Sequence, residues 1–282
     1  MPTVRLTLAV PGAARDAWVA ELSDLGFDAF EDTDAALLAY APAAAWTDTA
    51  RQAVRQGLRA AGLPPAQETV LPDQNWNEAW EATIQPLTVG AFVVAPTWAE
   101  LPALGGRALL RIDPKMAFGT GYHETTRIVL RLLPGAVASM PAPTVLDVGT
   151  GTGVLALGAL RLAPAATALG VDIDPWSATN ATENAALNGA ADRFTVREGS
   201  LDVVPEDGFG LVVANMIRSI LSPMLPDLVA RRAPGAPLVV SGLLATERDE
   251  AVATLAGLGL ELRDEGAENE WWGGTFGETA GR

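Results

Sequence analysis

The sequence contains no cysteine and a single histidine, His123. Without cysteine the chain has no disulfide, no thiol nucleophile and no thiolate-ligated metal. One histidine is too few for a multi-histidine metal site, so we expect no bound metal. Long apolar runs are also missing, since none reaches the roughly 18–20 residues that span a bilayer, and the N-terminal apolar stretch is too short for a secretory signal. We therefore expect a cytoplasmic protein without a membrane partner.

Basic residues are scarce, because 19 Lys and Arg stand against 34 Asp and Glu and leave a net charge of −15. Direct binding of nucleic acid is not expected, since it depends on Lys and Arg that neutralise phosphates. An acidic surface instead tolerates or attracts a basic macromolecule. The same charge is also typical of a soluble protein whose surface is acidic without any such partner.

The chain has 282 residues, 49% of them hydrophobic, which allows one large domain and one small one. Residues 1–72 are expected to form the small domain. Apolar alternation predicts strands at 3–10, 29–32, 35–40 and 68–71, and helical spacing predicts helices at 14–25 and 46–61. The resulting order β-α-β-β-α-β is typical of a ferredoxin-like α+β domain.

A polar segment that contains Trp76 and Trp80 follows. Residues four apart share one face of a helix, so we expect a linker helix within 73–90 whose tryptophans dock on a neighbouring domain. Two further strands are expected at 87–95 and 108–112, ahead of a Gly-rich loop.

Residues 91–282 are expected to form the large, catalytic domain. From residue 144 onward short apolar strands alternate with amphipathic helices, which is typical of a mostly parallel sheet covered by helices on both faces. We therefore predict an α/β, Rossmann-like fold. Strands are expected at 145–148, 168–172, 194–198, 211–215, 237–241 and 260–264, and helices at 154–162, 175–187, 217–231 and 246–258.

The first strand of this region runs into a glycine-rich turn at 147–153, with the sequence DVGTGTG, and then into a helix. Glycine permits a tight turn and close approach to a ligand, and a helix N-terminus offers free N–H groups. A dinucleotide-binding G-x-G-x-x-G would need glycine at position 154, where the sequence has Val154. The spacing present, G-x-G-x-G after an acidic residue, resembles that of class I methyltransferases, which bind S-adenosylmethionine (SAM).

An acidic residue also ends the second strand. Asp172 is the expected acceptor of both ribose hydroxyls, with Asp174 as the reserve candidate. An acidic residue at this place fits NAD as well. The structural alternative is a tight turn with an acidic helix cap and no ligand.

Three segments resemble the ribosomal protein L-eleven (L11) methyltransferase, or PrmA, family. Residues 113–126, DPKMAFGTGYHETT, resemble its D-P-G-M-A-F-G-T-G-x-H-x-T-T segment, residues 213–217 its V-A-N-I segment, and Trp76-x3-Trp80 with Gln85-Pro-Leu and Gly90 its W-x3-W…P-L-x-x-G segment. The resemblance covers residues 73–265, and the N-terminal domain by architecture only. It implies a class I methyltransferase domain with a seven-stranded sheet.

The resemblance implies an enzyme that transfers methyl groups from SAM to lysine ε-amines and the N-terminal α-amine of ribosomal protein L-eleven, a basic protein gripped by the N-terminal domain. It also implies cofactor contacts from Thr126, Gly149, Gly151, Asp172 and Asn215. We expect the enzyme to be a monomer.

Transfer from a sulfonium needs alignment and desolvation, and neither a metal nor a covalent nucleophile. Asn215 is expected to orient the acceptor amine, and the loop at 118–121 to close over it, so the candidate catalytic residues are Asn215, Phe118 and Thr120. Met-Ile-Arg follows Asn215, without the aromatic ring that stacks on planar nitrogens, which predicts an aliphatic amine as acceptor.

Several alternatives stay open. One is that the acceptor of the methyl group is another protein or a small-molecule amine. Others are that the chain is an NAD-dependent oxidoreductase or a non-catalytic binding module. His123 is a candidate general base, with stabilisation of its loop as the other interpretation. Alternation along a strand puts Trp271 and Trp272 on opposite faces, so at least one of them is expected in the core.

Overall fold

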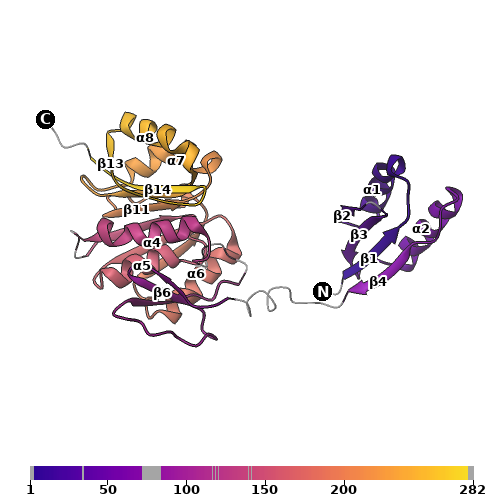
Figure 1. Cartoon of the computed structure of the whole chain (residues 1–282), viewed down its shortest axis with the longest axis horizontal. Helices are drawn as coiled ribbons and strands as arrows, with labels where there is room; N and C mark the ends of the chain where they lie inside the picture. The colour runs from indigo at the N-terminus through magenta and orange to yellow at the C-terminus, as the bar shows by residue number, and fades with distance from the viewer. Residues whose placement is uncertain are drawn as a thin grey trace. The chain divides into compact units, whose positions relative to one another are not determined.

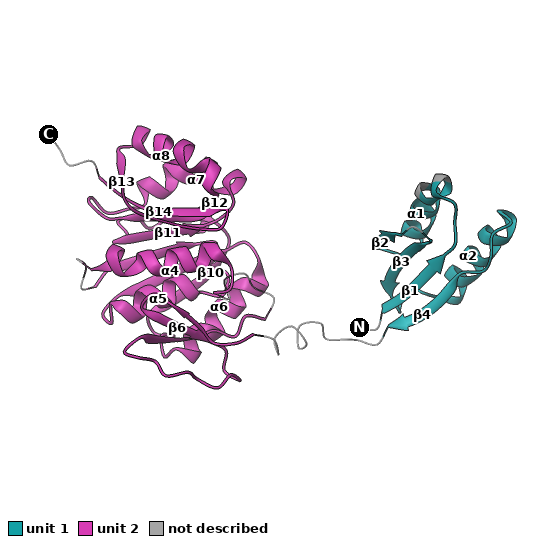
Figure 2. Cartoon of the chain, in the orientation of Figure 1, with its two compact units in different colours: residues 1–79 teal, residues 80–282 magenta. Residues whose placement is uncertain are grey.

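The structure is a computed structural model with two compact units, Met1–Ala79 and Trp80–Arg282 (Figure 2), each described here by itself. Most of the predicted linker helix, together with Phe118 and Thr120, lies outside the described residues. The division of the chain at residue 72 and at residue 90 therefore stays a prediction. The structure describes residues 3–33, 35–71, 84–115, 117, 119, 121–138, 140 and 142–278, without the side chains of Ala13 and Asp16.

The smaller unit is a four-stranded sheet with two helices (Figure 1). The strand order is β2-β3-β1-β4, and every neighbouring pair is antiparallel. This is the sheet that a ferredoxin-like β-α-β-β-α-β chain forms, so the predicted fold is confirmed. Its elements are β1 (Thr3–Leu8), α1 (Arg15–Asp24), β2 (Ala29–Asp32), β3 (Leu37–Pro42), α2 (Asp48–Ala60) and β4 (Gln67–Leu71).

The core of the smaller unit lies between its sheet and its helices. Alternate residues of β1, such as Leu6 and Leu8, are buried together with Trp18 and Leu22 of α1 and Leu58 of α2. The start of α2 is set by a side-chain cap, because the hydroxyl of Thr47 accepts a hydrogen bond from the backbone N–H of Ala50.

The larger unit begins with a small sheet of order β5-β6-β7. The single strand predicted at 87–95 is wrong, because Gly90, with a φ of 53°, turns the chain between β5 (Leu87–Val89) and β6 (Phe92–Ala95). β6 pairs antiparallel with β5 and parallel with β7 (Ala108–Arg111).

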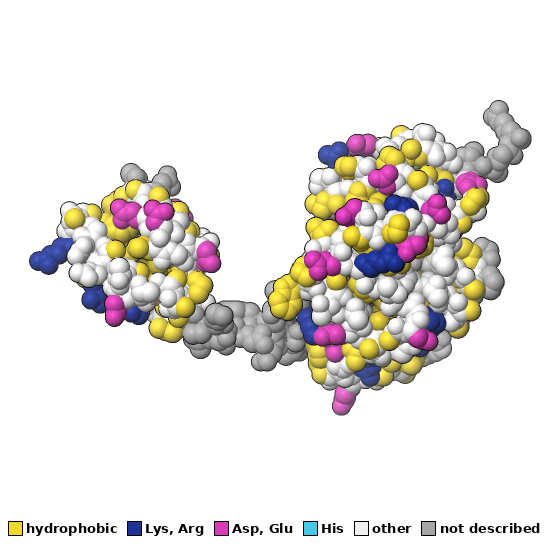
Figure 3. All heavy atoms as spheres, turned by 180° about the vertical axis from the view of Figure 1, so that it is seen from behind, with side chains coloured by type: hydrophobic (Ala, Val, Ile, Leu, Met, Phe, Trp, Pro, Cys, Tyr) yellow, Lys and Arg dark blue, Asp and Glu magenta, His cyan; other side chains and the backbone are white. Residues whose placement is uncertain are grey.

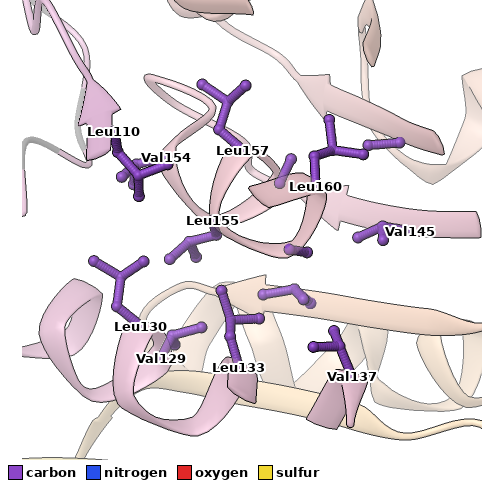
Figure 4. Packing of buried hydrophobic residues seen from close by; sticks show 14 of the residues in the cluster. Leu110, Val129, Leu130, Leu133, Val137, Val145, Val154, Leu155, Leu157 and Leu160 are labelled. Atoms are coloured by element: carbon purple, nitrogen blue, oxygen red, sulfur yellow. The ribbon is translucent and has the colours of Figure 1, made fainter. Parts of the chain in front are cut away.

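Helix α4 (Glu124–Val137) is an element that the sequence pattern did not indicate. Its Pro134-Gly135 pair is typical of a turn, yet both residues lie inside the last turns of the helix. Tertiary packing stabilises the helix where local propensity does not, since Val129, Leu130 and Leu133 are fully buried. Figure 4 shows these side chains directed at α5 (Val154–Leu162), whose own sequence is almost entirely apolar.

The main sheet of the larger unit has seven strands in the order β10-β9-β8-β11-β12-β14-β13. The pairs from β10 to β12 are parallel, and β14 is antiparallel to both of its neighbours. The predicted mostly parallel, seven-stranded sheet is therefore confirmed. The strands are β8 (Thr144–Val148), β9 (Thr167–Asp172), β10 (Phe194–Glu198), β11 (Leu211–Asn215), β12 (Leu238–Leu244), β13 (Leu260–Glu268) and β14 (Trp271–Glu278).

Helices cover both faces of this sheet (Figure 1). Helices α4, α5 and α6 (Pro175–Leu187) cover one face, and α7 (Arg218–Ala230) and α8 (Arg248–Gly257) the other. Successive strand residues point to opposite faces, so Val145 joins the hydrophobic cluster under α4 and α5 while Leu146 joins the one under α7 and α8. Burial on both faces explains why the central strands are continuous apolar runs.

Candidate active site

A cavity of about 460 Å³ opens at the carboxyl ends of β8, β9 and β11. In parallel sheets this edge binds ligands, because the strands end there beside free helix N-termini. The glycine turn forms part of its wall, together with the ends of β9 and β11 and the start of α7. The cavity is lined by His123, Thr125, Val148, Gly149, Gly151, Asp172, Ile173, Ser177, Gly199, Ser200, Asn215, Met216, Ile217, Ile220, Met224, Gly242 and Trp271.

The turn after β8 requires glycine for conformational and steric reasons. Gly149, Gly151 and Gly153 have φ values of 71°, 54° and 81°, a region that other residues avoid. A Cβ on Gly149 would stand 3.2 Å from the Met216 side chain, and one on Gly153 would stand 2.8 Å from the Phe194 ring. Gly149 and Gly151, both predicted cofactor contacts, lie on the cavity wall.

The turn is stabilised by hydrogen bonds to Asp147, which is fully buried. Its Oδ2 accepts hydrogen bonds from the Thr150 hydroxyl at 2.8 Å and from the Ala156 N–H at 3.2 Å. Burial raises the pKa of this carboxyl to about 6, although both hydrogen bonds act to lower it. Its Oδ1 has no hydrogen-bond partner among the described residues. The sequence placed Asp147 in the motif without assigning a role to it.

Asp172 ends β9 on the cavity wall. Its two carboxylate oxygens accept hydrogen bonds from the N–H groups of Gly151, at 2.9 Å, and Asp174, at 3.0 Å. The reserve candidate Asp174 instead caps α6, where it accepts from Trp176 N–H and from both the N–H and the hydroxyl of Ser177. These bonds, the Ser177 hydroxyl first, lower the pKa of Asp174. The geometry favours Asp172 for ribose binding, and that role stays a prediction.

Asn215 ends β11 on the opposite side of the cavity. Its Oδ1 is buried and has no partner among the described residues. An unpaired buried carbonyl is costly unless a ligand donates to it. Asn215 therefore offers a hydrogen-bond acceptor at the end of β11, at the wall of the cavity.

The segment before α4 adds one wall of the cavity. His123 caps α4, because its Nδ1 accepts from the Thr125 N–H at 3.3 Å and lies 2.9 Å from the Thr125 hydroxyl. The imidazole ring packs edge-on against Trp271, with 4.9 Å between the ring centroids. Trp272 is buried in the core, as alternation predicted for one of the two tryptophans. The sequence did not indicate that His123 and Trp271, 148 positions apart, would meet.

Thr126 is placed differently from the other predicted cofactor contacts. It is fully buried in the first turn of α4, and the cavity wall is formed by Thr125 beside it. The Thr126 hydroxyl has no partner among the described residues, so a contact with the cofactor stays a prediction. Phe118 and Thr120, the other candidate catalytic residues, fall outside the described part of the chain.

Charged side chains of both signs lie close together on part of the surface of the larger unit. On the face shown in Figure 3, Lys and Arg side chains of the larger unit lie among acidic ones. In the larger unit, Arg127 and Arg131 pair with Glu268, and Arg248 pairs with Glu265. Among the described residues no helix is long and apolar enough to cross a membrane.

A seven-stranded sheet of this order, with a glycine turn after its first strand and an acidic residue after its second, defines a class I methyltransferase. The sequence model of the family "Ribosomal protein L11 methyltransferase (PrmA)" matches residues 23–276. The chain belongs to this family and is a SAM-dependent protein methyltransferase.

Individual relatives agree with the family match. A ribosomal protein L11 methyltransferase from Pelobacter propionicus is 40% identical over 208 residues, which span 72% of this chain and 66% of that protein. One from Chlorobaculum tepidum is 33% identical over 247 residues, 86% of this chain and 84% of the relative. The crystal structure of a ribosomal protein L11 methylase from Lactobacillus delbrueckii subsp. bulgaricus superimposes with a TM-score of 0.63 at 29% identity, and covers 70% of this chain and all of that one.

Proposed function

We propose that this enzyme methylates ribosomal protein L11, on lysine ε-amines and on the N-terminal α-amine. The relatives that match most of the chain carry that name. The observation that carries the proposal is Asn215 on the cavity wall, whose buried Oδ1 has no hydrogen-bond partner in the part of the chain that the structure describes. An amine N–H is a suitable donor to this oxygen, and the residues after Asn215, Met216 and Ile217, offer no ring for a planar acceptor.

SAM, when bound, would supply the methyl group on its sulfonium: one N–C bond forms as one C–S bond breaks, and the sulfur leaves as a neutral thioether. The acceptor nitrogen attacks with its lone pair, so it must reach the site as a neutral amine. Apolar side chains around Asn215, namely Met216, Ile217, Ile220 and Met224, favour the neutral form because they penalise an ammonium ion. Asn215 Oδ1 accepts a hydrogen bond from one N–H of the amine and thereby directs the nitrogen lone pair at the methyl carbon.

A dedicated general base is not required by this scheme. The proton that the methylated nitrogen loses passes to water at the open side of the cavity. His123 already has a structural task, since its Nδ1 caps α4. In this arrangement the Nδ1 lone pair is turned toward the Thr125 N–H and is not available to the acceptor.

Recognition of the protein substrate is proposed for the N-terminal domain at 1–72. This part contains nine Asp and Glu against five Arg, a balance that suits a basic partner. The edge strand β2 carries two of the acidic residues, Glu31 and Asp32; both are exposed, and Asp32 forms an ion pair with Arg15. We further propose that the enzyme acts as a cytoplasmic monomer, and sedimentation of the purified chain tests the oligomeric state.

The direct test is transfer of labelled methyl groups to purified, unmethylated ribosomal protein L11. The enzyme has one lysine, Lys115, so label in the substrate band is easily told apart from self-methylation. Mass spectrometry of the product then identifies the modified amines. Binding of SAM without transfer to L11 would leave the enzyme class intact and point to another protein or to a small amine. Binding of NAD, measured in parallel, is expected to be absent.

A further inference from the structure

A row of three asparagines is buried along α6. Asn180 and Asn184 lie within the helix and Asn188 caps its C-terminus; they are four residues apart and so follow one face, and all three are at most 6% exposed. Buried carboxamides are costly unless they form hydrogen bonds. Among the described residues none of these three leaves a buried side-chain atom unpaired.

The row binds the extended chain that follows β7. Asn188 accepts from the Arg111 N–H at 3.0 Å and donates to the Arg111 carbonyl at 2.6 Å. Asn184 accepts from the Asp113 N–H at 3.0 Å, and Asn180 donates to the Asp113 carbonyl at 2.9 Å. The asparagines therefore pair with this backbone as a neighbouring strand would.

Asn184 makes one bond that the other two lack. Its Nδ2 donates to the carbonyl of Thr152, inside the glycine turn, at 2.9 Å. The hydroxyl of the same Thr152 donates to the Gly119 carbonyl at 2.7 Å. Thr152 therefore joins the glycine turn to the backbone at two places. Its carbonyl is linked to Asp113 through Asn184, and its hydroxyl binds the carbonyl of Gly119 directly.

We propose that Asn184 is a positioning residue for methyl transfer, which holds the glycine turn in the conformation that receives SAM by linking Thr152 to the backbone at Asp113. Three glycines with positive φ give the turn a large conformational entropy in the absence of restraints. A turn that is already ordered binds its ligand at a lower entropic cost. Asn188 makes equivalent bonds one turn further along and does not reach the glycine turn.

This difference supplies a matched pair of variants of the full-length enzyme, Asn184→Ala and Asn188→Ala. Both remove a buried carboxamide from the same helix face, so both are expected to lower the melting temperature by similar amounts. Only Asn184→Ala is expected to weaken SAM binding, by about tenfold in calorimetric titration, while Asn188→Ala stays within about twofold of the parent. Hydrogen exchange of the amides at 149–153, without SAM, is expected to be faster in Asn184→Ala alone.

Asn184→Asp and Asn188→Asp provide a second pair in case the alanine variants do not fold. Aspartate keeps the volume and the acceptor for the Asp113 N–H, but it cannot donate to Thr152 when ionised. Equal dissociation constants for SAM in both members of a pair, together with equal exchange at 149–153, would overturn the proposed role. Because SAM binding is measured without any acceptor, these results do not depend on whether ribosomal protein L11 is the substrate.

Discussion

The carboxylate of Asp172 accepts a hydrogen bond from the backbone N–H of Gly151 at 2.9 Å. This bond ties the end of β9 to the glycine turn after β8, although 21 positions separate the two residues. The acidic residue that is expected to bind the ribose therefore also orders the turn. Loss of this carboxylate is expected to affect cofactor binding in both ways.

Replacement of Asp172 tests this expectation. Asp172→Ala is expected to raise the dissociation constant of SAM by at least tenfold, because charge-assisted hydrogen bonds contribute about 1.5–3 kcal/mol each. Asp174→Ala is the matched control, since it removes a helix cap and lowers stability while SAM affinity stays within about twofold. Calorimetric titration of both variants decides the matter, and equal losses of affinity would contradict the assignment to Asp172.

Asn215→Ala is expected to slow methyl transfer by about a hundredfold at saturating SAM, on the scale observed when an oriented hydrogen-bonding group is removed from an active site. Single-turnover measurements with labelled SAM and unmethylated L11 give this rate. Asn188→Ala, which removes a carboxamide that does not line the cavity, is expected to retain a normal rate. Full transfer by Asn215→Ala would rule out its proposed role in orienting the acceptor.

His123→Gln is expected to leave the dependence of the transfer rate on pH unchanged between pH 6 and 9. The physical reason is that His123 caps α4 and that displacement at a sulfonium needs no dedicated base. The variant is expected to lose up to about 1 kcal/mol of stability with the cap. A rate that collapses in this variant while its fold persists would instead identify His123 as the base.

The buried carboxyl of Asp147 is expected to make the stability of the folded protein depend on pH. Its pKa is about 6 in the folded protein against an ordinary value of 3.8, so the folded state binds the proton more tightly than the unfolded one. The resulting stability is fully present below the ordinary value and is lost as pH rises through about 6. The free energy of unfolding of the parent, minus that of Asp147→Asn, is expected to fall by up to about 3 kcal/mol between pH 4 and pH 7. Denaturant titrations at several pH values measure it, and a flat difference would contradict the prediction.

Deletion of residues 1–72 is expected to abolish methylation of L11 and to leave SAM binding within about twofold of the full chain. The glycine turn, Asp172 and Asn215 all belong to the larger unit, so the cofactor site does not depend on the deleted part. Melting with and without SAM verifies that the shortened enzyme is folded. Continued methylation of L11 at the parental rate would show that recognition resides elsewhere.

Local patterns were sufficient for much of the fold. Helices α5 and α6 and strands β10 and β11 have the bounds that periodicity predicted. Each is a short apolar or amphipathic segment bounded by glycine, proline or a cap, so local and global preferences agree. Helix α4 was missed because its Pro134-Gly135 pair opposes helix formation locally, and only its burial against α5 offsets that cost.

For the site, the sequence by itself determined the glycine turn, because glycine spacing reports a backbone conformation that no other residue adopts at low cost. It also determined the candidates Asp172 and Asn215, since the carboxyl ends of parallel strands lie at one edge of the sheet, where β9 and β11 flank β8. Only the tertiary structure decided that His123 packs on Trp271, that Thr125 rather than Thr126 lines the cavity, and that Asn184 links Thr152 to Asp113. These relationships join residues distant in sequence, and their geometry depends on how helices and strands pack, which local periodicity does not encode.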